Sequence, residues 1–103
     1  MAQFDVHENR EKARSGAPLL LDLQSDFLAS LPSRLVAPLR PPKAFPARID
    51  RLHPFVMVGG KRYVLAMSEM AAVNRRVLGP KAGSLEQRRF DIINAMDFLI
   101  SGF

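Results

Sequence analysis

Few side chains in this sequence are suited to catalysis, and none of them stands in a recognisable catalytic pattern. The 103 residues include two histidines and no cysteine, which excludes disulfides, thiolate nucleophiles and thiolate metal sites. His7 and His53 each lack a second imidazole or a carboxylate at metal-ligand spacing, so we expect surface or hydrogen-bonding roles for both. The pattern therefore predicts no catalytic residue, no metal site and no cofactor.

The other polar groups have simpler explanations than catalysis. Asp22 and Asp26 could form a carboxylate pair, but an acidic residue at a strand end is usually a turn former. Gly59-Gly60 joins two predicted strands rather than a strand and a helix, so it is not a phosphate-binding loop. No serine is flanked by the glycines of a nucleophile elbow. We therefore expect a binding protein and not an enzyme.

Composition indicates one small globular domain over residues 1–103. With 48% hydrophobic and 24% charged residues, the chain is long enough for one hydrophobic core and too short for two. Its N-terminus lacks a signal-peptide pattern. It also lacks any apolar run as long as the ~20 residues needed to span a membrane. We expect a cytoplasmic protein with no membrane contact. The net charge of +5 favours an acidic partner, either nucleic acid or protein, although a solvated basic surface is the preferred explanation.

Apolar runs and turn residues predict several short strands. They cover residues 3–6, 19–23, 34–37, 55–58, 61–67, 70–73 and 75–78. A polar loop is expected at 7–18, and Pro38 should end the third strand, since residues 38–46 hold four prolines. Pro38-Leu39-Arg40-Pro41 also fits a loose SH3-ligand pattern, but a rigid crossover is preferred. Gly59-Gly60 should form a tight hairpin turn, and Gly79-Pro80 should close the last strand.

A single helix is predicted after the strands. Ser84 and Gln87 fit a capping box, which places the helix at about 85–100, and Gly102 is a natural terminator. Strands followed by one helix indicate a small β-barrel or curled sheet with a helix packed on it. The stripe expected to cover the barrel consists of Leu85, Ile92, Met96, Leu99 and Phe103, with Ile93 and Ile100 on its flank.

Two aromatic residues lie on the opposite, polar face of this helix. Phe90 and Phe98 share that face with Asp91, Asn94 and Asp97. Each ring is either exposed, which would mark an interface, or covered by another part of the fold, and the sequence leaves both alternatives open. The helix pattern thus predicts an interaction surface rather than an active site.

Five segments together resemble CcdB toxins over nearly the whole chain. They are Met1 to Phe4, Asp22 to Leu28, Arg34 to Leu39, Met70 to Val73 and Asp91 to Phe103. The resemblance implies an SH3-like antiparallel barrel, mainly β with one C-terminal helix, assembled as a homodimer. It also implies the toxin of a type II toxin–antitoxin pair, which binds the DNA gyrase A subunit and traps the cleaved-DNA complex. An acidic antitoxin would neutralise it, and the complex of the two would repress their operon, so operator DNA is reached only through that complex.

The resemblance also assigns the gyrase contacts. They would be Phe27, Leu28, Asp97, Ile100, Ser101, Gly102 and Phe103. Ser101 stands where the best-known members carry a tryptophan, and Phe103 where they carry an isoleucine, which leaves the strength of gyrase poisoning open. Two alternatives remain. One is an endoribonuclease on the same barrel, as in MazF-like toxins, and the other is a degenerate relative that binds only antitoxin.

Overall fold

The computed structural model describes residues 2–102, which form seven strands, two α-helices and five 3-10 turns. The strands are β1 (Asp5–Asn9), β2 (Leu19–Asp22), β3 (Ser33–Arg40), β4 (Phe55–Val58), β5 (Lys61–Leu65), β6 (Ala71–Asn74) and β7 (Leu78–Ser84). The α-helices are α1 (Lys12–Ser15) and α2 (Arg89–Ser101). The 3-10 turns are η1 (Asp26–Leu28), η2 (Pro42–Ala44), η3 (Met67–Glu69), η4 (Arg75–Val77) and η5 (Glu86–Arg88).

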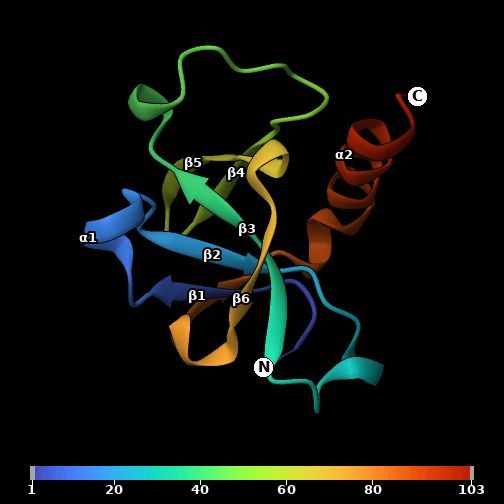
Figure 1. Ribbon diagram of the computed structural model, residues 1–103. Coiled ribbons are helices and arrows are strands. Elements are labelled where there is room, and N and C mark those ends of the chain that lie inside the picture. Colours follow the sequence, from blue (N-terminus) through green and yellow to red (C-terminus); the bar gives the residue numbers. More distant parts are fainter. Residues whose placement is uncertain (1, 103) are drawn as a thin grey trace.

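All seven strands belong to one antiparallel sheet that curls around the core (Figure 1). The order is β4-β5-β3-β2-β1-β7, and β6 pairs with the other half of β3. The two ends of the sheet come close together: a Cβ on Gly83 of β7 would lie 3.2 Å from Val58 Cγ1 of β4. The predicted fold class, a mainly β, SH3-like antiparallel barrel with one C-terminal helix, is confirmed.

The hydrophobic core lies between the curled sheet and α2. Ile92 and Ala95 are fully buried on the inner face of the helix, and Leu85 is buried just before it. Arg88 fixes the start of the helix to β4, because its Nη1 donates to the Phe55 carbonyl oxygen at 2.9 Å. Burying a side chain such as that of Ile92 contributes about 1.5–3 kcal/mol, so the inner face holds α2 on the barrel.

The Gly59-Gly60 hairpin is confirmed. It joins β4 to β5, and both glycines have positive φ, 59° and 77°. Positive φ at both central residues is the geometry of the turn that matches the twist of the flanking strands, and glycine adopts it without a steric cost.

The prediction that Pro38 ends the third strand is wrong, because β3 continues to Arg40. The Pro38 carbonyl oxygen accepts a hydrogen bond from the Ala66 amide at 2.9 Å, so its nitrogen side faces the segment between β5 and β6. β3 changes partner at this point, from β6 to β5. A proline is tolerated there because no ladder hydrogen bond is due from its nitrogen.

The predicted opening strand and the loop at 7–18 need correction. The strand begins at Asp5 and continues to Asn9, and a single turn of helix, α1, lies within the expected loop. Polar residues His7 and Asn9 are buried in this strand. The Asn9 side chain donates to the Ala17 carbonyl oxygen at 2.9 Å, so hydrogen bonds of buried polar groups, together with the buried Val6, hold the strand in place.

The expected strand at 75–78 is also wrong. Residues 75–77 form η4, and β7 begins at Leu78 and runs through Gly79-Pro80. The pairing of β1 with β7 shifts register between His7 and Asn9. This bulge accommodates the proline on a strand at the end of the sheet order.

The start of the C-terminal helix differs from the capping-box prediction, whereas its end agrees. Ser84 Oγ accepts from the Glu86 amide at 3.2 Å rather than from that of Gln87, and a 3-10 turn precedes α2. Gly102 ends the helix with a φ of 80°, and its amide donates to the Phe98 carbonyl oxygen at 2.9 Å. Within residues 2–102, no helix combines the length and apolar character needed to cross a membrane.

Candidate functional site

The C-terminal part of the predicted site is an exposed helix end. Asp97, Ser101 and Gly102 are exposed, and the Ile100 side chain is 71% exposed. The Ser101 hydroxyl donates to the Asp97 carbonyl oxygen at 2.7 Å, which ties this side chain back to its own helix. Phe103, the last residue assigned to the site, lies outside the described residues. The surface left to a partner therefore consists of a bare helix end with one aliphatic side chain.

The second part of the predicted site is the η1 turn. Phe27 is 99% exposed and Leu28 is 51% exposed, so two large apolar side chains lie on the surface at successive positions. Exposed apolar groups on a short loop gain nothing for folding, because burial is the source of hydrophobic stabilisation. Such a pair is typical of a contact surface.

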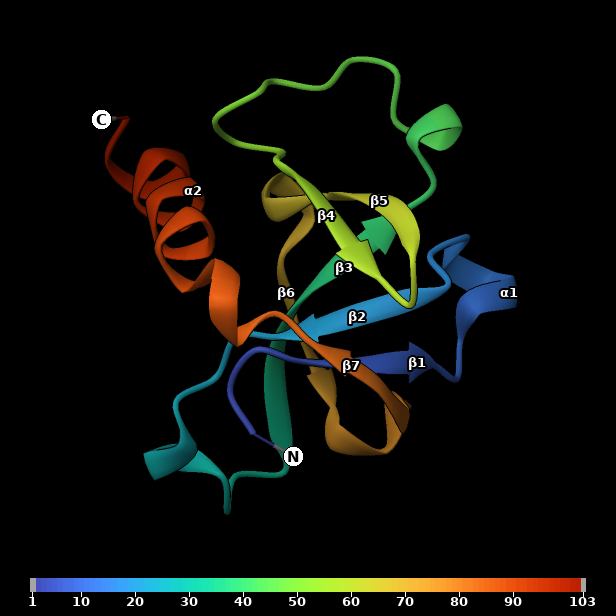
Figure 2. The ribbon, with the colours of Figure 1, turned by 180° about the vertical axis from the view of Figure 1, so that it is seen from behind.

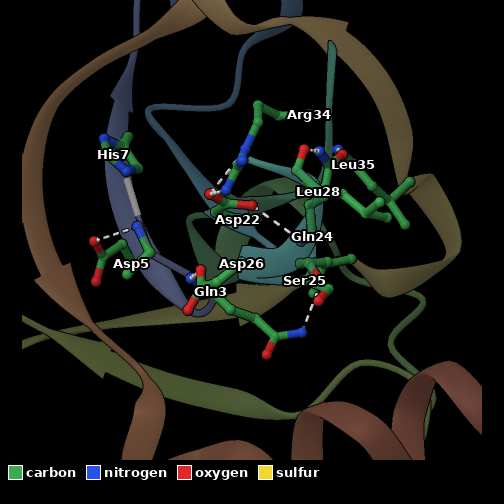
Figure 3. A network of polar contacts seen from close by, with 12 residues as sticks. Gln3, Asp5, His7, Asp22, Gln24, Ser25, Asp26, Leu28, Arg34 and Leu35 are labelled. Carbon is green, nitrogen blue, oxygen red and sulfur yellow. Dashed lines mark hydrogen bonds and ion pairs between the residues drawn. The ribbon is translucent and has the colours of Figure 1, made fainter. Parts of the chain in front are cut away.

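A network of polar contacts fixes the backbone of this turn (Figure 3). Gln24 is central: its Oε1 accepts from the Leu35 amide at 3.1 Å, and its Nε2 donates to the Leu28 carbonyl oxygen at 2.9 Å. Asp22 Oδ1 accepts from the Gln24 amide at 3.0 Å. On the other side of the turn, Asp26 Oδ1 accepts from the Gln3 amide at 2.8 Å. The network presents the η1 turn in one conformation, which lowers the entropy lost when a partner binds.

The two parts of the predicted site are not brought together in one chain. Figures 1 and 2 place η1 near the N-terminus and the end of α2 at the opposite end of the molecule. A single partner that contacts both must therefore cover a long side of the protein, or contact different copies of the chain.

The two aromatic residues of α2 differ in exposure: one ring is exposed and the other is partly covered by the fold. Phe90 is 79% exposed, whereas Phe98 is half-buried against the core, with the Arg51 guanidinium 4.7 Å from its ring centroid. Ile93 is also exposed, and with Ile100 it departs from the prediction that these flanking residues cover the barrel. Phe90, Ile93, Asp97 and Ile100 follow helical spacing, so they line one exposed and largely apolar stripe along α2.

Sequence reasoning missed a buried ion pair beside the η1 network. Asp22 and Arg34 are both fully buried; Arg34 Nε donates to Asp22 Oδ2 at 3.2 Å, and Nη2 contacts the same oxygen. Arg34 Nη1 has no partner among the described residues. Asp22 is a turn former, as predicted, since its Oδ1 accepts from the Gln24 amide, but it is also the counter-ion of a buried cation. The available signal was one acidic and one basic residue, each inside a predicted strand, because a buried charge needs an opposite charge beside it.

Both histidines are buried, so of the two roles expected for them they take the hydrogen-bonding one rather than a surface position. His7 Nδ1 lies 2.9 Å from the Gly79 carbonyl oxygen. His53 accepts from the Ile49 amide at 3.0 Å through Nδ1 and contacts Ser68 Oγ at 2.7 Å through Nε2. Burial, together with the Arg48 guanidinium, lowers the pKa of His53 below 6.5, against the opposing effect of Glu69. Within residues 2–102, no three His, Cys, Asp or Glu residues are grouped to hold a metal ion.

Comparisons with known proteins agree with this architecture. The family model described as "CcdB protein" matches residues 3–102. Two solved structures are similar in fold. "Endoribonuclease from Mycobacterial species" has a TM-score of 0.71 and 14% identity, covering 97% of this chain and 90% of that one. "Endoribonuclease in complex with its cognate antitoxin from Mycobacterial species" has a TM-score of 0.73 and 15% identity, covering 97% and 94%.

These structures contradict the prediction that the chain is not an enzyme. Both are named endoribonucleases, so this fold does carry enzymes. The prediction was based on the absence of catalytic motifs along the sequence. That reasoning fails because catalytic groups are defined by their positions in space and can come from segments distant in sequence.

Proposed function

Since the chain belongs to the CcdB protein family, we propose that it acts as a single toxin domain, the toxin of a type II toxin–antitoxin module. The family match over residues 3–102 is the observation that carries this proposal. A protein of similar fold was solved with its cognate antitoxin, which supports an antitoxin as partner. The net charge of +5 suits an acidic antitoxin, since opposite charges speed association. In the module, the toxin–antitoxin complex represses its own operon, so operator DNA is bound through the antitoxin.

The target we propose is the gyrase A subunit, whose cleaved-DNA complex the toxin would trap. Two surfaces are available for it: the η1 turn, with Phe27 99% exposed, and the end of α2, with Ile100 71% exposed. A two-fold toxin dimer would supply two copies of each surface to a two-fold target. The exposed stripe on α2 is suited to a contact of this kind, because interface centres are enriched in apolar and aromatic side chains.

RNA cleavage is the second candidate function. It is supported by the fold that the chain shares with two endoribonucleases and by the basic net charge, which suits a polyanion. The two candidates differ in which residues they need. A gyrase poison depends on the exposed apolar contacts, whereas a ribonuclease depends on polar groups that bind and cleave RNA.

The test is gyrase-dependent DNA cleavage with purified protein, beside RNA cleavage under the same conditions. The native chain should accumulate cleaved DNA, and deletion of 101–103 or Phe27→Ser should abolish or strongly reduce it. Ile49→Ser is the control, because Ile49 is another large apolar residue on the surface, 53% exposed, in a loop outside the proposed contacts. Absence of DNA cleavage at high toxin concentration, together with RNA cleavage that survives the deletion, would overturn the gyrase proposal in favour of the ribonuclease.

A further inference from the structure

A single imidazole ties the longest connection between strands to the rest of the fold. This loop, residues 41–54, joins β3 to β4 and arches toward α2 (Figures 1 and 2). His53 lies near its end and is 4% exposed. The ring has three neighbours: Nδ1 accepts from the Ile49 amide at 3.0 Å, Nε2 contacts Ser68 Oγ at 2.7 Å, and the Phe45 ring centroid lies 4.6 Å away. His53 therefore joins two points of the loop to η3.

These contacts require a neutral imidazole. Because Nδ1 accepts a hydrogen bond, the single proton of the neutral ring lies on Nε2 and is donated to the Ser68 hydroxyl oxygen. A second proton can bind only at Nδ1, the atom that faces the Ile49 amide. Two N–H groups would then point at each other, so this hydrogen bond is lost, whereas the contact with Ser68 is kept. Protonation thus acts on the loop and not on η3.

The surroundings of the ring favour its neutral form. Burial is the largest cause that lowers the pKa of His53 below 6.5, and the Arg48 guanidinium adds to it. Arg48 lies on the same loop, where Nη1 donates to the His53 carbonyl oxygen at 2.9 Å and Asp50 is its ion-pair partner. Glu69 on η3 has the opposite effect, but its Oε1 already accepts from Arg40 Nε at 2.6 Å. A protonated ring is therefore more stable outside this site than inside it.

The rest of the loop is held mainly by local contacts. In the described part of the chain, the backbone hydrogen bonds of residues 41–51 reach no farther than His53, whose amide donates to the Ile49 carbonyl oxygen at 2.7 Å. One contact of this segment reaches α2: the Arg51 guanidinium lies 4.7 Å from the ring centroid of Phe98. Release of the segment would therefore remove a cation that covers one aromatic ring of the C-terminal helix.

We propose that His53 is a pH-sensitive latch: protonation of Nδ1 releases residues 41–51 from the barrel and uncovers Phe98 on α2. Leu52 is buried in the core, so it keeps the end of the loop in place and the barrel stays folded. Loss of Arg51 from the Phe98 ring widens the apolar surface of the helix. The latch belongs to the fold and requires neither gyrase binding nor RNA cleavage.

Hydrogen exchange of the full chain, followed by NMR, measures this opening at the Ile49 amide. After correction for the intrinsic pH dependence of exchange, protection of this amide should fall by at most about tenfold per pH unit below 6.5 and level off below the folded-state pKa of His53. The amide of Leu21 in β2 should keep its protection. The NMR shifts of the Phe98 ring should change with the same midpoint, and in Arg51→Gln they should lose most of this pH dependence.

Two variants separate the imidazole from other titrating groups. His53→Asn keeps an acceptor near the position of Nδ1 but does not titrate, so Ile49 should stay protected at every pH. His53→Ala removes the acceptor, so Ile49 should exchange rapidly at every pH while Leu21 stays protected.

Three results would overturn the proposal. Ile49 could keep its protection across the pH range in which the imidazole is seen to titrate. His53→Asn could lose protection over the same range as the native chain, which would assign the effect to a carboxylate such as that of Glu69. The Leu21 amide could lose protection together with Ile49, which would make the transition global unfolding. None of these measurements involves gyrase or RNA, so a failure of either proposed activity would leave the result unaffected.

Discussion

Replacing Asp22 by asparagine removes the counter-ion of a fully buried guanidinium while keeping the shape of the side chain. Arg34 then has no negative charge beside it and no access to water, since both residues are fully buried. Breaking one partner of a buried pair costs about 3–5 kcal/mol. A domain of this size has a total stability of about 5–15 kcal/mol, so Asp22→Asn should leave the fold only marginally stable.

The double variant Asp22→Asn with Arg34→Met separates charge from shape. Methionine fills the space of the arginine stem, and asparagine still accepts the hydrogen bond of the Gln24 amide through Oδ1. Apolar replacement of a buried pair is often neutral or stabilising. We therefore expect the double variant to recover most of the stability that Asp22→Asn loses.

Urea unfolding followed by circular dichroism measures these differences. Asp50→Asn is the matched control, because Asp50 pairs with Arg48 but its side chain is 88% exposed; it should cost about 0–1 kcal/mol. The reasoning is refuted if Asp22→Asn costs no more than Asp50→Asn. If instead the double variant is no more stable than Asp22→Asn, the loss comes from packing and not from the unpaired charge.

Three further changes test the structure at other points. Gln24→Ala leaves the Leu35 amide without its partner and removes one of the two hydrogen bonds to the Leu28 carbonyl oxygen, so it should cost about 1–3 kcal/mol and speed hydrogen exchange in the η1 turn. Unchanged exchange would contradict the role of the network. Gly79→Ala places a Cβ 2.9 Å from the Glu8 carbonyl oxygen, so its thermal midpoint should fall, and a midpoint equal to native would show that β7 moves freely. His53 has its pKa lowered in the folded state, so its stabilising contribution is complete above 6.5 and is lost as the pH falls through the lower, folded-state value. The unfolding free energy should therefore decline between about pH 7 and pH 5 more steeply in the native chain than in His53→Gln, and equal slopes would refute this assignment.

The sequence predicted correctly those turns and helix ends whose geometry depends on the residue type at one position. The Gly59-Gly60 turn needs positive φ, and Gly102 ends a helix for the same reason, so both were visible in the sequence. Pro38 and Pro80 misled the prediction because their effect depends on the neighbouring strand. One lies where β3 changes partner and the other at a bulge, and neither fact is contained in the surrounding residues.

In the candidate site, too, some residues were identified from the sequence, whereas others are brought together only by the fold. Phe27 and the end of α2, which family resemblance assigns to the site, are exposed, and their role stays a prediction. The surface hollow lined by Arg10, Arg75 and Arg76 was not predicted, because Arg10 and Arg75 are distant in sequence and only the register of β1 against β7 places them together. The Asp22–Arg34 pair was missed for a similar reason: charge sequence alone does not show that β2 and the start of β3 enclose both side chains.

The pairing of β1 with β7 has a consequence for how the chain is made. Asp5 of β1 pairs with Ser84 of β7, and α2 follows that strand after the short turn η5. Chains fold as they emerge from the ribosome, N-terminal parts first, but β1 must wait for one of its two neighbours until residue 84 has been released. The exposed end of α2 is synthesised later still. An incomplete chain released early therefore lacks both the β1–β7 pairing and the α2 part of the proposed contact surface, so premature termination of translation should yield an inactive product.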